Sequence, residues 1–541
     1  MARIAAEDIF EMGSKRDKIL RIATRYLHLI KPPSRRKINP MIKKLKDLLF
    51  HNQTARQTVA KNTFWLVVSN FGGRIIRAVL IIYAARVLGA AGWGVFAYAI
   101  SVVAFITTFS DIGINSILLR DASRAGDENL RRKIISTSFI TKMAALVLGV
   151  LAVIFIAPRA TSVAEVTTIL PIIVFILIFD TLRDFGSSVI RSLEKMEWEA
   201  VFYLLTNVAI LAFGITFLHF SRTVQSLAYA YAIGDAVGVI ATLTFLSGKL
   251  KGILTSFSFS SLKSILISAW PFAVSNLLGV LMINTDILII GWILSAKDVG
   301  LYSAAQRIIQ LMYLIPATIN VSILPILSRL AAHKDSVKIR RIIENGISLV
   351  FAIGIPITVG GFILAKELMV FFFGPAYLAS TLPFQVLILT ILVDFPANLL
   401  SGLLFSYNRQ RALIWNGVIG GGLNVVFDLL FIPRFGIAGS SLATLLAQLV
   451  SMQYLWWIAR KANYFEVLSH LKRVILASGV MAIVALGLSL LSVHVLVNIA
   501  VSGVVYAGVL FFFREPLIKE LKLILRPEGS VDPLAAEPTS L

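Results

Sequence analysis

Apolar runs of about twenty residues recur along this chain from residue 64 to residue 513. As an α-helix, each run is long enough to cross a hydrocarbon core roughly 30 Å thick. Hydrophobic residues make up 57% of the sequence, and its mean hydropathy of +0.83 is far above that of a soluble domain. The sequence therefore predicts an all-α polytopic membrane protein rather than soluble domains joined by linkers.

We predict fourteen transmembrane helices with mostly short connections. They lie near 64–88, 94–118, 135–157, 166–189, 200–219, 224–247, 266–293, 300–327, 342–364, 382–406, 411–432, 437–459, 474–492 and 494–513. With a cytoplasmic N-terminus, 40 of the 51 Lys and Arg residues fall in cytoplasmic segments and 5 in external loops. Basic residues resist translocation. This pattern predicts that both termini are cytoplasmic and that the protein lies in the cell membrane.

The charge and composition also exclude several classes of function. The net charge of +22 is explained by this topology, so no nucleic-acid partner is expected. The chain has no cysteine, its six histidines show no metal spacing, and it lacks a phosphate-binding Walker A motif. No segment after residue 60 is long enough for a catalytic domain. We expect a transporter that is not an enzyme and that uses neither a cofactor nor a metal centre.

Two segments lie outside the predicted spans. Residues 1–60 form a basic cytoplasmic extension containing "DKILRIATRYLHLI", whose apolar residues suit an amphipathic helix on anionic lipid. A solvated basic arm is the alternative. Residues 515–541 form a polar, Pro-rich cytoplasmic tail that is predicted to be disordered.

The sequence contains an internal repeat. "WLVVSN" at residue 65 resembles "WPFAVSN" at residue 270, and "LGAAGWGVFAYA" at residue 88 resembles "LSAKDVGLYSAA" at residue 294. Asn70 and Asn276 are separated by 206 residues, as are Gly94 and Gly300. Two parallel six-helix lobes, related by a pseudo-two-fold axis along the membrane normal, would bind a substrate between them. The predicted divisions are 61–260 and 261–462 for the two lobes and 463–514 for two additional helices, 13 and 14.

The stretch "ARVLGAAGWGVFAYAIS", followed by "FSDIGINSILLRDASR", resembles the N-terminal signature of the polysaccharide-biosynthesis flippases, which include O-antigen and oligosaccharide flippases. Their superfamily also holds the multidrug and toxin extrusion (MATE) transporters and the lipid II flippases. The matching residues are Arg86, Leu88, Gly89, Gly94, Asp111 and Gly113. The chain departs from the pattern at Ala91, often acidic or polar in the family, and at Trp93, usually Tyr. The resemblance implies a MATE-like fold and movement of a lipid-linked oligosaccharide.

Three polar residues interrupt the first predicted span on one helical face: Asn70, Arg74 and Arg77, at i, i+4 and i+7. An arginine near the middle of a membrane is unfavourable unless it faces a hydrated cavity or an anion. Because guanidinium groups bind phosphate oxygens with two parallel donors, we predict a lipid diphosphate site here. A structural ion pair with a membrane acid is the alternative.

The second lobe differs at the equivalent positions. Val280 and Ile283 replace the two arginines, and Asp286 follows one turn later. We expect Asp286, Asp394 and Asp235 to couple transport to an ion or to pair with Arg74. Asp180 and Arg183, three residues apart, are predicted to pair with each other.

A polar patch in the eighth span adds a further candidate site. Its residues are Gln306, Arg307 and Gln310. They would bind sugar hydroxyls or phosphate, and hydrogen bonding between helices is the alternative.

The leading hypothesis is a flippase that moves a polyprenyl-(pyro)phosphate-linked oligosaccharide from the cytoplasmic to the outer leaflet for cell-surface glycan assembly. Its partners would be that substrate, membrane lipids and possible glycan polymerases, ligases or glycosyltransferases. An ion-coupled drug or cation antiporter on the same fold and a lipid II flippase are the alternatives.

Overall fold

The computed structural model describes residues 55–161, 163–248, 255–466 and 468–513. The segments predicted to be amphipathic or disordered at the two termini lie outside these ranges. Over the described ranges the regular structure is entirely helical. The chain divides into two compact units, 1–64 and 65–541, and every contact discussed below lies in the second.

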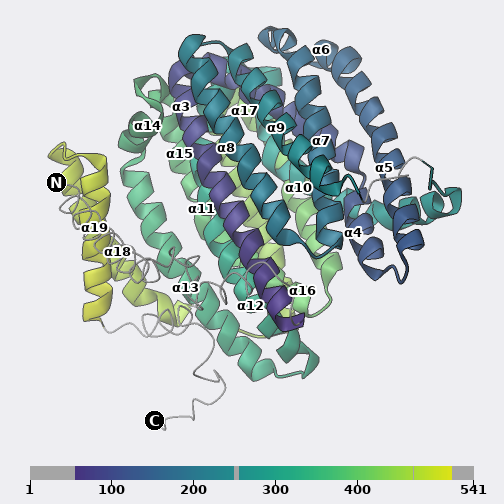
Figure 1. Cartoon of the computed structure of the whole chain (residues 1–541). Helices are drawn as coiled ribbons and strands as arrows, with labels where there is room; N and C mark the ends of the chain where they lie inside the picture. Colours follow the sequence, from purple (N-terminus) through teal and green to yellow (C-terminus); the bar gives the residue numbers. More distant parts are fainter. Residues whose placement is uncertain (1–54, 162, 249–254, 467, 514–541) are drawn as a thin grey trace, which may run out of the picture. The chain divides into compact units, whose positions relative to one another are not determined.

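The first half of the described chain contains seven α-helices (Figure 1). They are α3 (Ala55–Asp111), α4 (Ile114–Arg124), α5 (Glu128–Leu151), α6 (Ala157–Ala160), α7 (Leu170–Ser192), α8 (Met196–Phe220) and α9 (Val224–Leu246). A π-helix joins α5 to α6, and a 3-10 turn precedes α7. Helices α4, α5, α7, α8 and α9 pack on one another in this half of the chain.

The second half contains the remaining described helices. They are α10 (Phe259–Ile293), α11 (Ala296–Met312), α12 (Leu314–Ala332), α13 (Ser336–Ile363), α14 (Ala365–Phe373), α15 (Thr381–Ile388), α16 (Ile391–Ser406), α17 (Gln410–Ala462), α18 (Leu468–Leu490) and α19 (Val495–Phe512). A 3-10 segment, η3 (Pro375–Ser380), precedes α15. The pair α18–α19 packs mainly on α13.

Ten helical segments among the described residues are long and apolar enough to cross a membrane, and up to eleven if the bent pair around α15 and α16 counts as one span. Two of the ten contain a break, at Gly89 in α3 and at Gly436 in α17, where φ is positive. A further helix, α7, is not among the ten because it carries Asp180, Arg183 and Asp184 in its middle. The fold is polytopic and all-α, and it is consistent with fourteen spans without establishing that number.

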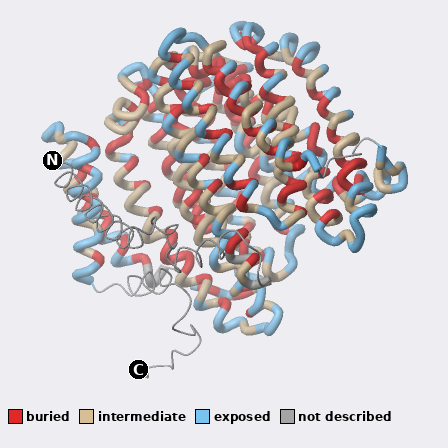
Figure 2. Tube along the Cα trace, viewed as in Figure 1, coloured by how far each residue is buried: buried red, intermediate tan, exposed pale blue. Residues whose placement is uncertain are grey.

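Exposed residues lie along the outer helices (Figure 2), and many of them are large apolar residues. Leu148 on α5 is 68% exposed, and Phe155 and Ile156 in the following π-helix are exposed as well. Exposure of such continuous apolar faces to water would be unfavourable, whereas lipid tails can cover them without this cost. Burial is confined to the surfaces where helices meet.

Three spans predicted as continuous helices are broken. The span predicted at 94–118 ends as a helix at Asp111, because Ile112 and Gly113 have φ values of 44° and 74°. A Cβ atom at Gly113 would lie 2.6 Å from the Ala269 carbonyl oxygen of α10, so this close approach requires glycine. The span at 300–327 is divided between α11 and α12, and the one at 382–406 between α15 and α16.

Candidate functional site

Arg77 on α3 is half-buried and is held by neutral partners. Its Nε donates to Asn207 Oδ1 on α8 at 3.1 Å, and its guanidinium lies 5.8 Å from the ring centroid of Tyr231 on α9. Asn207 is itself fixed, since its Nδ2 donates to the Tyr203 carbonyl at 2.7 Å. No carboxylate forms an ion pair with Arg77 among the described residues, so its charge is oriented and remains available for an anion.

The other two residues of the predicted cationic face are more open. Arg74 is exposed and has no ion-pair partner in the described part of the chain. Asn70 is also exposed, and its Nδ2 donates to the Leu66 carbonyl one turn earlier at 2.8 Å. The predicted pairing of Arg74 with Asp235, Asp286 or Asp394 does not occur in this structure.

Arg307 on α11 brings a second cation to the same place from the other half of the chain. Its charge interacts with that of Arg77, and both act on Tyr231. One terminal nitrogen of Arg307 donates to Gln310 Oε1 at 2.9 Å, whereas its buried Nε has no hydrogen-bond partner. Two arginines from the two predicted lobes are therefore close enough for their charges to interact, and Arg77 also contacts the Tyr231 ring. The sequence does not predict a role for Tyr231 or Asn207, although both are polar residues within predicted spans.

Gln306 takes part in hydrogen bonding between helices, which is the alternative prediction for this patch. Its Nε2 donates to the Ile283 carbonyl of α10 at 3.1 Å, and only 8% of the residue is exposed. This bond joins two helices, so it does not present the amide to a substrate.

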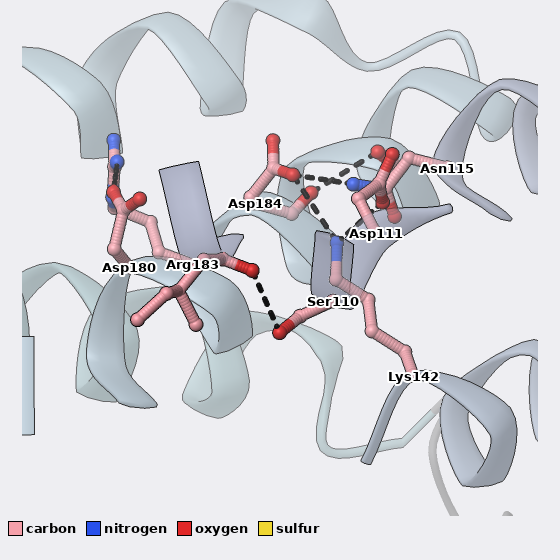
Figure 3. A network of polar contacts seen from close by, with 9 residues as sticks. Ser110, Asp111, Asn115, Lys142, Asp180, Arg183 and Asp184 are labelled. Atoms are coloured by element: carbon pink, nitrogen blue, oxygen red, sulfur yellow. Dashed lines mark hydrogen bonds and ion pairs between the residues drawn. The ribbon is translucent and has the colours of Figure 1, made fainter. Parts of the chain in front are cut away.

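A buried lysine forms ion pairs with two aspartates near the end of the second predicted span (Figure 3). Lys142 on α5 has a fully buried side chain, and its Nζ lies 2.9 Å from Asp111 Oδ1 and 3.2 Å from Asp184 Oδ2. Asn115 on α4 also donates to Asp184. The sequence does not predict a role for Lys142, because its partners come from two other helices, α3 and α7.

The predicted pairing of Asp180 with Arg183 on α7 is confirmed by a direct ion pair, drawn in Figure 3. Arg183 also lies 3.9 Å from Asp235 Oδ1 on α9 and 5.6 Å from the ring centroid of Tyr203. Asp235 therefore pairs with Arg183 within the first lobe and not with the predicted partner Arg74.

The second lobe holds two neighbouring carboxyl groups. Asp286 on α10 and Asp428 on α17 lie close enough for their side chains to interact, and both residues are almost completely buried. Asp286 Oδ2 accepts from the Tyr302 hydroxyl and from Thr444 Oγ1, the latter at 3.1 Å. Asp428 has a donor of its own, since the Ser440 hydroxyl donates to Asp428 Oδ1 at 2.9 Å.

This pair has no basic partner among the described residues. Asp286 Oδ1, Asp428 Oδ2 and Asn424 Oδ1 are buried and have no hydrogen-bond partner among the described residues. Two neighbouring carboxylates cannot both stay ionised and unpaired in a buried site, so a shared proton or a small cation must neutralise them. Oxygen ligands suit a hard cation. No cluster of three His, Cys, Asp or Glu side chains occurs in the described part of the chain.

Asp394 on α16 is half-exposed, and its carboxylate makes no hydrogen bond or ion pair with another described residue. Nearby, Tyr313 and Thr390 share a hydrogen bond of 2.6 Å. The chain bends by 41° just before Asp394, between the segment that ends with α15 and the helix α16. Asp394 lies in the first turn of α16, where the helix dipole favours a negative charge.

Comparison with known proteins identifies the relatives of this fold. A lipid II flippase, MurJ, in an inward closed conformation has a TM-score of 0.69 over 83% of this chain and 99% of its own, at 16% identity. An inward-facing MATE-family multidrug resistance transporter has a TM-score of 0.60 over 74% of this chain and 98% of its own, at 13% identity. These likenesses show that the fold is MATE-like, as predicted.

Similarity in sequence extends over most of the chain. A protein described as "Putative O-antigen transporter" from Shigella flexneri is 21% identical over 76% of this chain and all of its own length. "Probable flippase AglR" from Haloferax volcanii is 23% identical over 70% of this chain and 79% of its own. The family described as MatE matches residues 271–430, and the family described as Polysaccharide biosynthesis protein matches residues 59–331, which is half of the chain. The chain is therefore a multi-pass membrane protein that belongs to the polysaccharide biosynthesis protein family.

Proposed function

We propose that this protein is a flippase that moves a polyprenyl-(pyro)phosphate-linked oligosaccharide from the cytoplasmic to the outer leaflet by alternating access. The convergence of Arg77 and Arg307 from the two halves of the chain is the observation that carries the proposal. The relatives described as "Putative O-antigen transporter" and "Probable flippase AglR" agree with it. Both termini would lie in the cytoplasm, and glycan polymerases or ligases would act on the product.

The two arginines suit a diphosphate better than an organic cation. Arg77 and Arg307 repel each other, and no described carboxylate forms an ion pair with either. A bound phosphate relieves that repulsion and supplies acceptors for the unpartnered Nε of Arg307. Because each arginine belongs to a different lobe, relative movement of the lobes changes the distance between them. Substrate binding would therefore depend on the conformational state.

Coupling to an ion would take place in the second lobe. Asp286 and Asp428 require a proton or cation, and α10 and α17 pack against each other around them. Loading and release of that cation would change how these helices pack. Asp394 and Asp235 are weaker candidates, since Asp235 is already paired with Arg183.

Purified protein in liposomes with a fluorescent polyprenyl-diphosphate oligosaccharide tests the proposal. Arg77→Gln and Arg307→Gln should each slow flipping at least about tenfold, which is about 1.4 kcal/mol. Arg434→Gln, at an exposed position of α17, is the matched control and should flip normally. Normal flipping in both arginine variants would refute the phosphate site. Transport of an organic cation without flipping would favour the antiporter, and selective flipping of lipid II would favour that flippase.

A further inference from the structure

A small cavity lies where α14 meets α18, α19 and the turn that joins them (Figure 1). Its volume is about 280 Å³, near the lower end of the roughly 300–1,000 Å³ that is usual for small-molecule sites. It is therefore large enough for a lipid headgroup and too small for an oligosaccharide. Part of its lining is apolar, and the polar part consists of Lys366, Glu367, Ser489, Ser492 and Asn498.

Contacts between side chains fix the walls of this cavity. The Ser489 hydroxyl of α18 donates to Glu367 Oε1 of α14 at 2.6 Å. Asn498 of α19 is 1% exposed, and its Nδ2 donates to a backbone carbonyl of α18 at 2.9 Å. The ring of Phe371 on α14 packs perpendicular to that of His494, with centroids 5.6 Å apart. The cavity is thus part of the packed structure of these three helices.

Lys366 and Glu367 bring opposite charges to the same cavity. Neither forms an ion pair with the other or with any further residue that the structure describes. Consecutive residues on an α-helix point about 100° apart, so these two side chains reach the cavity from different directions. Ser489 uses one carboxylate oxygen of Glu367, while Oε2 receives no hydrogen bond from a described residue. A ligand that carries both a negative and a positive group would satisfy both side chains.

The surface beside the cavity is apolar. Leu490 at the end of α18 is 85% exposed, Leu491 in the turn that follows is 76% exposed, and Leu496 on α19 is 50% exposed. A free amino acid would leave this surface uncovered, whereas the acyl chains of a phospholipid cover it. In the orientation that the basic residues predict, Lys366 lies on the external side, at the level of outer-leaflet headgroups.

We propose that this cavity binds the headgroup of a zwitterionic phospholipid that has a primary ammonium group, such as phosphatidylethanolamine. Lys366 contacts the phosphate, and Glu367 Oε2 accepts a hydrogen bond from the ammonium group. The bound lipid connects α14 to the α18–α19 pair, in addition to the bond from Ser489. This site is independent of the substrate that the protein moves.

The two charges predict which lipids bind. A primary ammonium group has N–H donors, so it makes a charge-assisted hydrogen bond with Glu367. The quaternary ammonium group of phosphatidylcholine has no N–H and cannot make this bond. Phosphatidylglycerol keeps the contact between its phosphate and Lys366, but it has no cation for Glu367. Phosphatidylethanolamine should therefore bind most tightly of the three.

Native mass spectrometry of the delipidated full chain measures this preference. The protein is titrated with phosphatidylethanolamine, phosphatidylcholine and phosphatidylglycerol that have the same acyl chains, and the first bound lipid is counted. Phosphatidylethanolamine should bind at least about tenfold more tightly than phosphatidylcholine, as expected for one hydrogen bond to a charged group.

Two variants separate the contributions of the two charges. Glu367→Gln retains an acceptor for Ser489 but removes the charge, so the preference for phosphatidylethanolamine over phosphatidylcholine should disappear. Lys366→Gln should weaken both lipids by a similar factor, because both have the phosphate. Lys297→Gln and Glu165→Gln, at exposed positions, are the matched controls and should bind as the parent does.

Three results would overturn the proposal. They are equal binding of the three lipids by the parent, tighter binding of phosphatidylglycerol, and a preference for phosphatidylethanolamine that survives in Glu367→Gln. If Glu367→Gln does not fold, Lys366→Glu at its exposed position is the second test. It places a negative charge against the phosphate, so tight binding of the first phosphatidylethanolamine should be lost, and retention of that binding would overturn the site.

Discussion

The two halves of this protein surround their buried carboxylates with different kinds of groups. In the first half, Lys142 and Arg183 each lie between two aspartates, so each buried carboxylate there has a cation beside it within the protein. In the second half, Asp286 and Asp428 lie close to each other and are surrounded by hydroxyl and amide groups. A network whose buried carboxylates have cations within the protein stabilises a structure, whereas one that lacks a cation must obtain it from solution. We therefore expect the first half's network to be structural, and we propose that an ion couples to transport in the second half.

The largest effect should follow removal of the buried lysine. Lys142→Met leaves Asp111 buried without its cation, and breaking a buried ion pair in this way costs about 3–5 kcal/mol. We expect a much lower melting temperature in detergent, measured by the loss of the monodisperse peak on heating.

A double variant separates charge from packing at this position. Lys142→Met with Asp111→Asn should recover most of the stability, because the buried carboxylate is gone and Asp184, the other partner of Lys142, has a side chain that is 50% exposed to solvent. A single variant as stable as the parent would contradict a structural role for this network.

The next largest effect should be on transport rather than on stability. Asp428→Asn gives Asp286 an amide donor in place of a second carboxyl group, so the fold should be retained while the cation site is lost. Flipping in liposomes should become insensitive to imposed sodium and proton gradients. Glu165→Gln, at an exposed position, should leave that response unchanged. A gradient response that persists in Asp428→Asn would remove the distinction between the two halves.

The smallest effect is expected at Asp180. Its side chain is 34% exposed, and Arg183 keeps Asp235 as a second carboxylate when Asp180 is replaced. Asp180→Asn should therefore destabilise the protein by no more than about 1 kcal/mol, as is usual for a solvated ion pair. The same melting measurement checks this value. A loss as large as that of Lys142→Met would show that the first half's two networks act as one unit.

Much of the architecture could be predicted because its causes are local. The length of each apolar run is a property of consecutive residues, and so is the i, i+3 spacing that pairs Asp180 with Arg183. The helix breaks were harder to predict. Ile112 is a β-branched residue with φ of 44°, a conformation that its own sequence disfavours and that only packing of Gly113 against α10 explains.

The sequence by itself determined a membrane-spanning helical chain, a repeat with a 206-residue offset, and an arginine-bearing face on the first span opposite an acid in the second repeat. Hydropathy, repeat spacing and helical periodicity are sufficient for these features. Only the tertiary structure decided which charges meet: Asn207 reaches Arg77 across 130 residues, and Thr444 reaches Asp286 across 158. The physical reason is that a buried charge is stabilised by whichever side chain the packing of the helices brings within about 4 Å. The identity of that neighbour cannot be read from spacing along the chain.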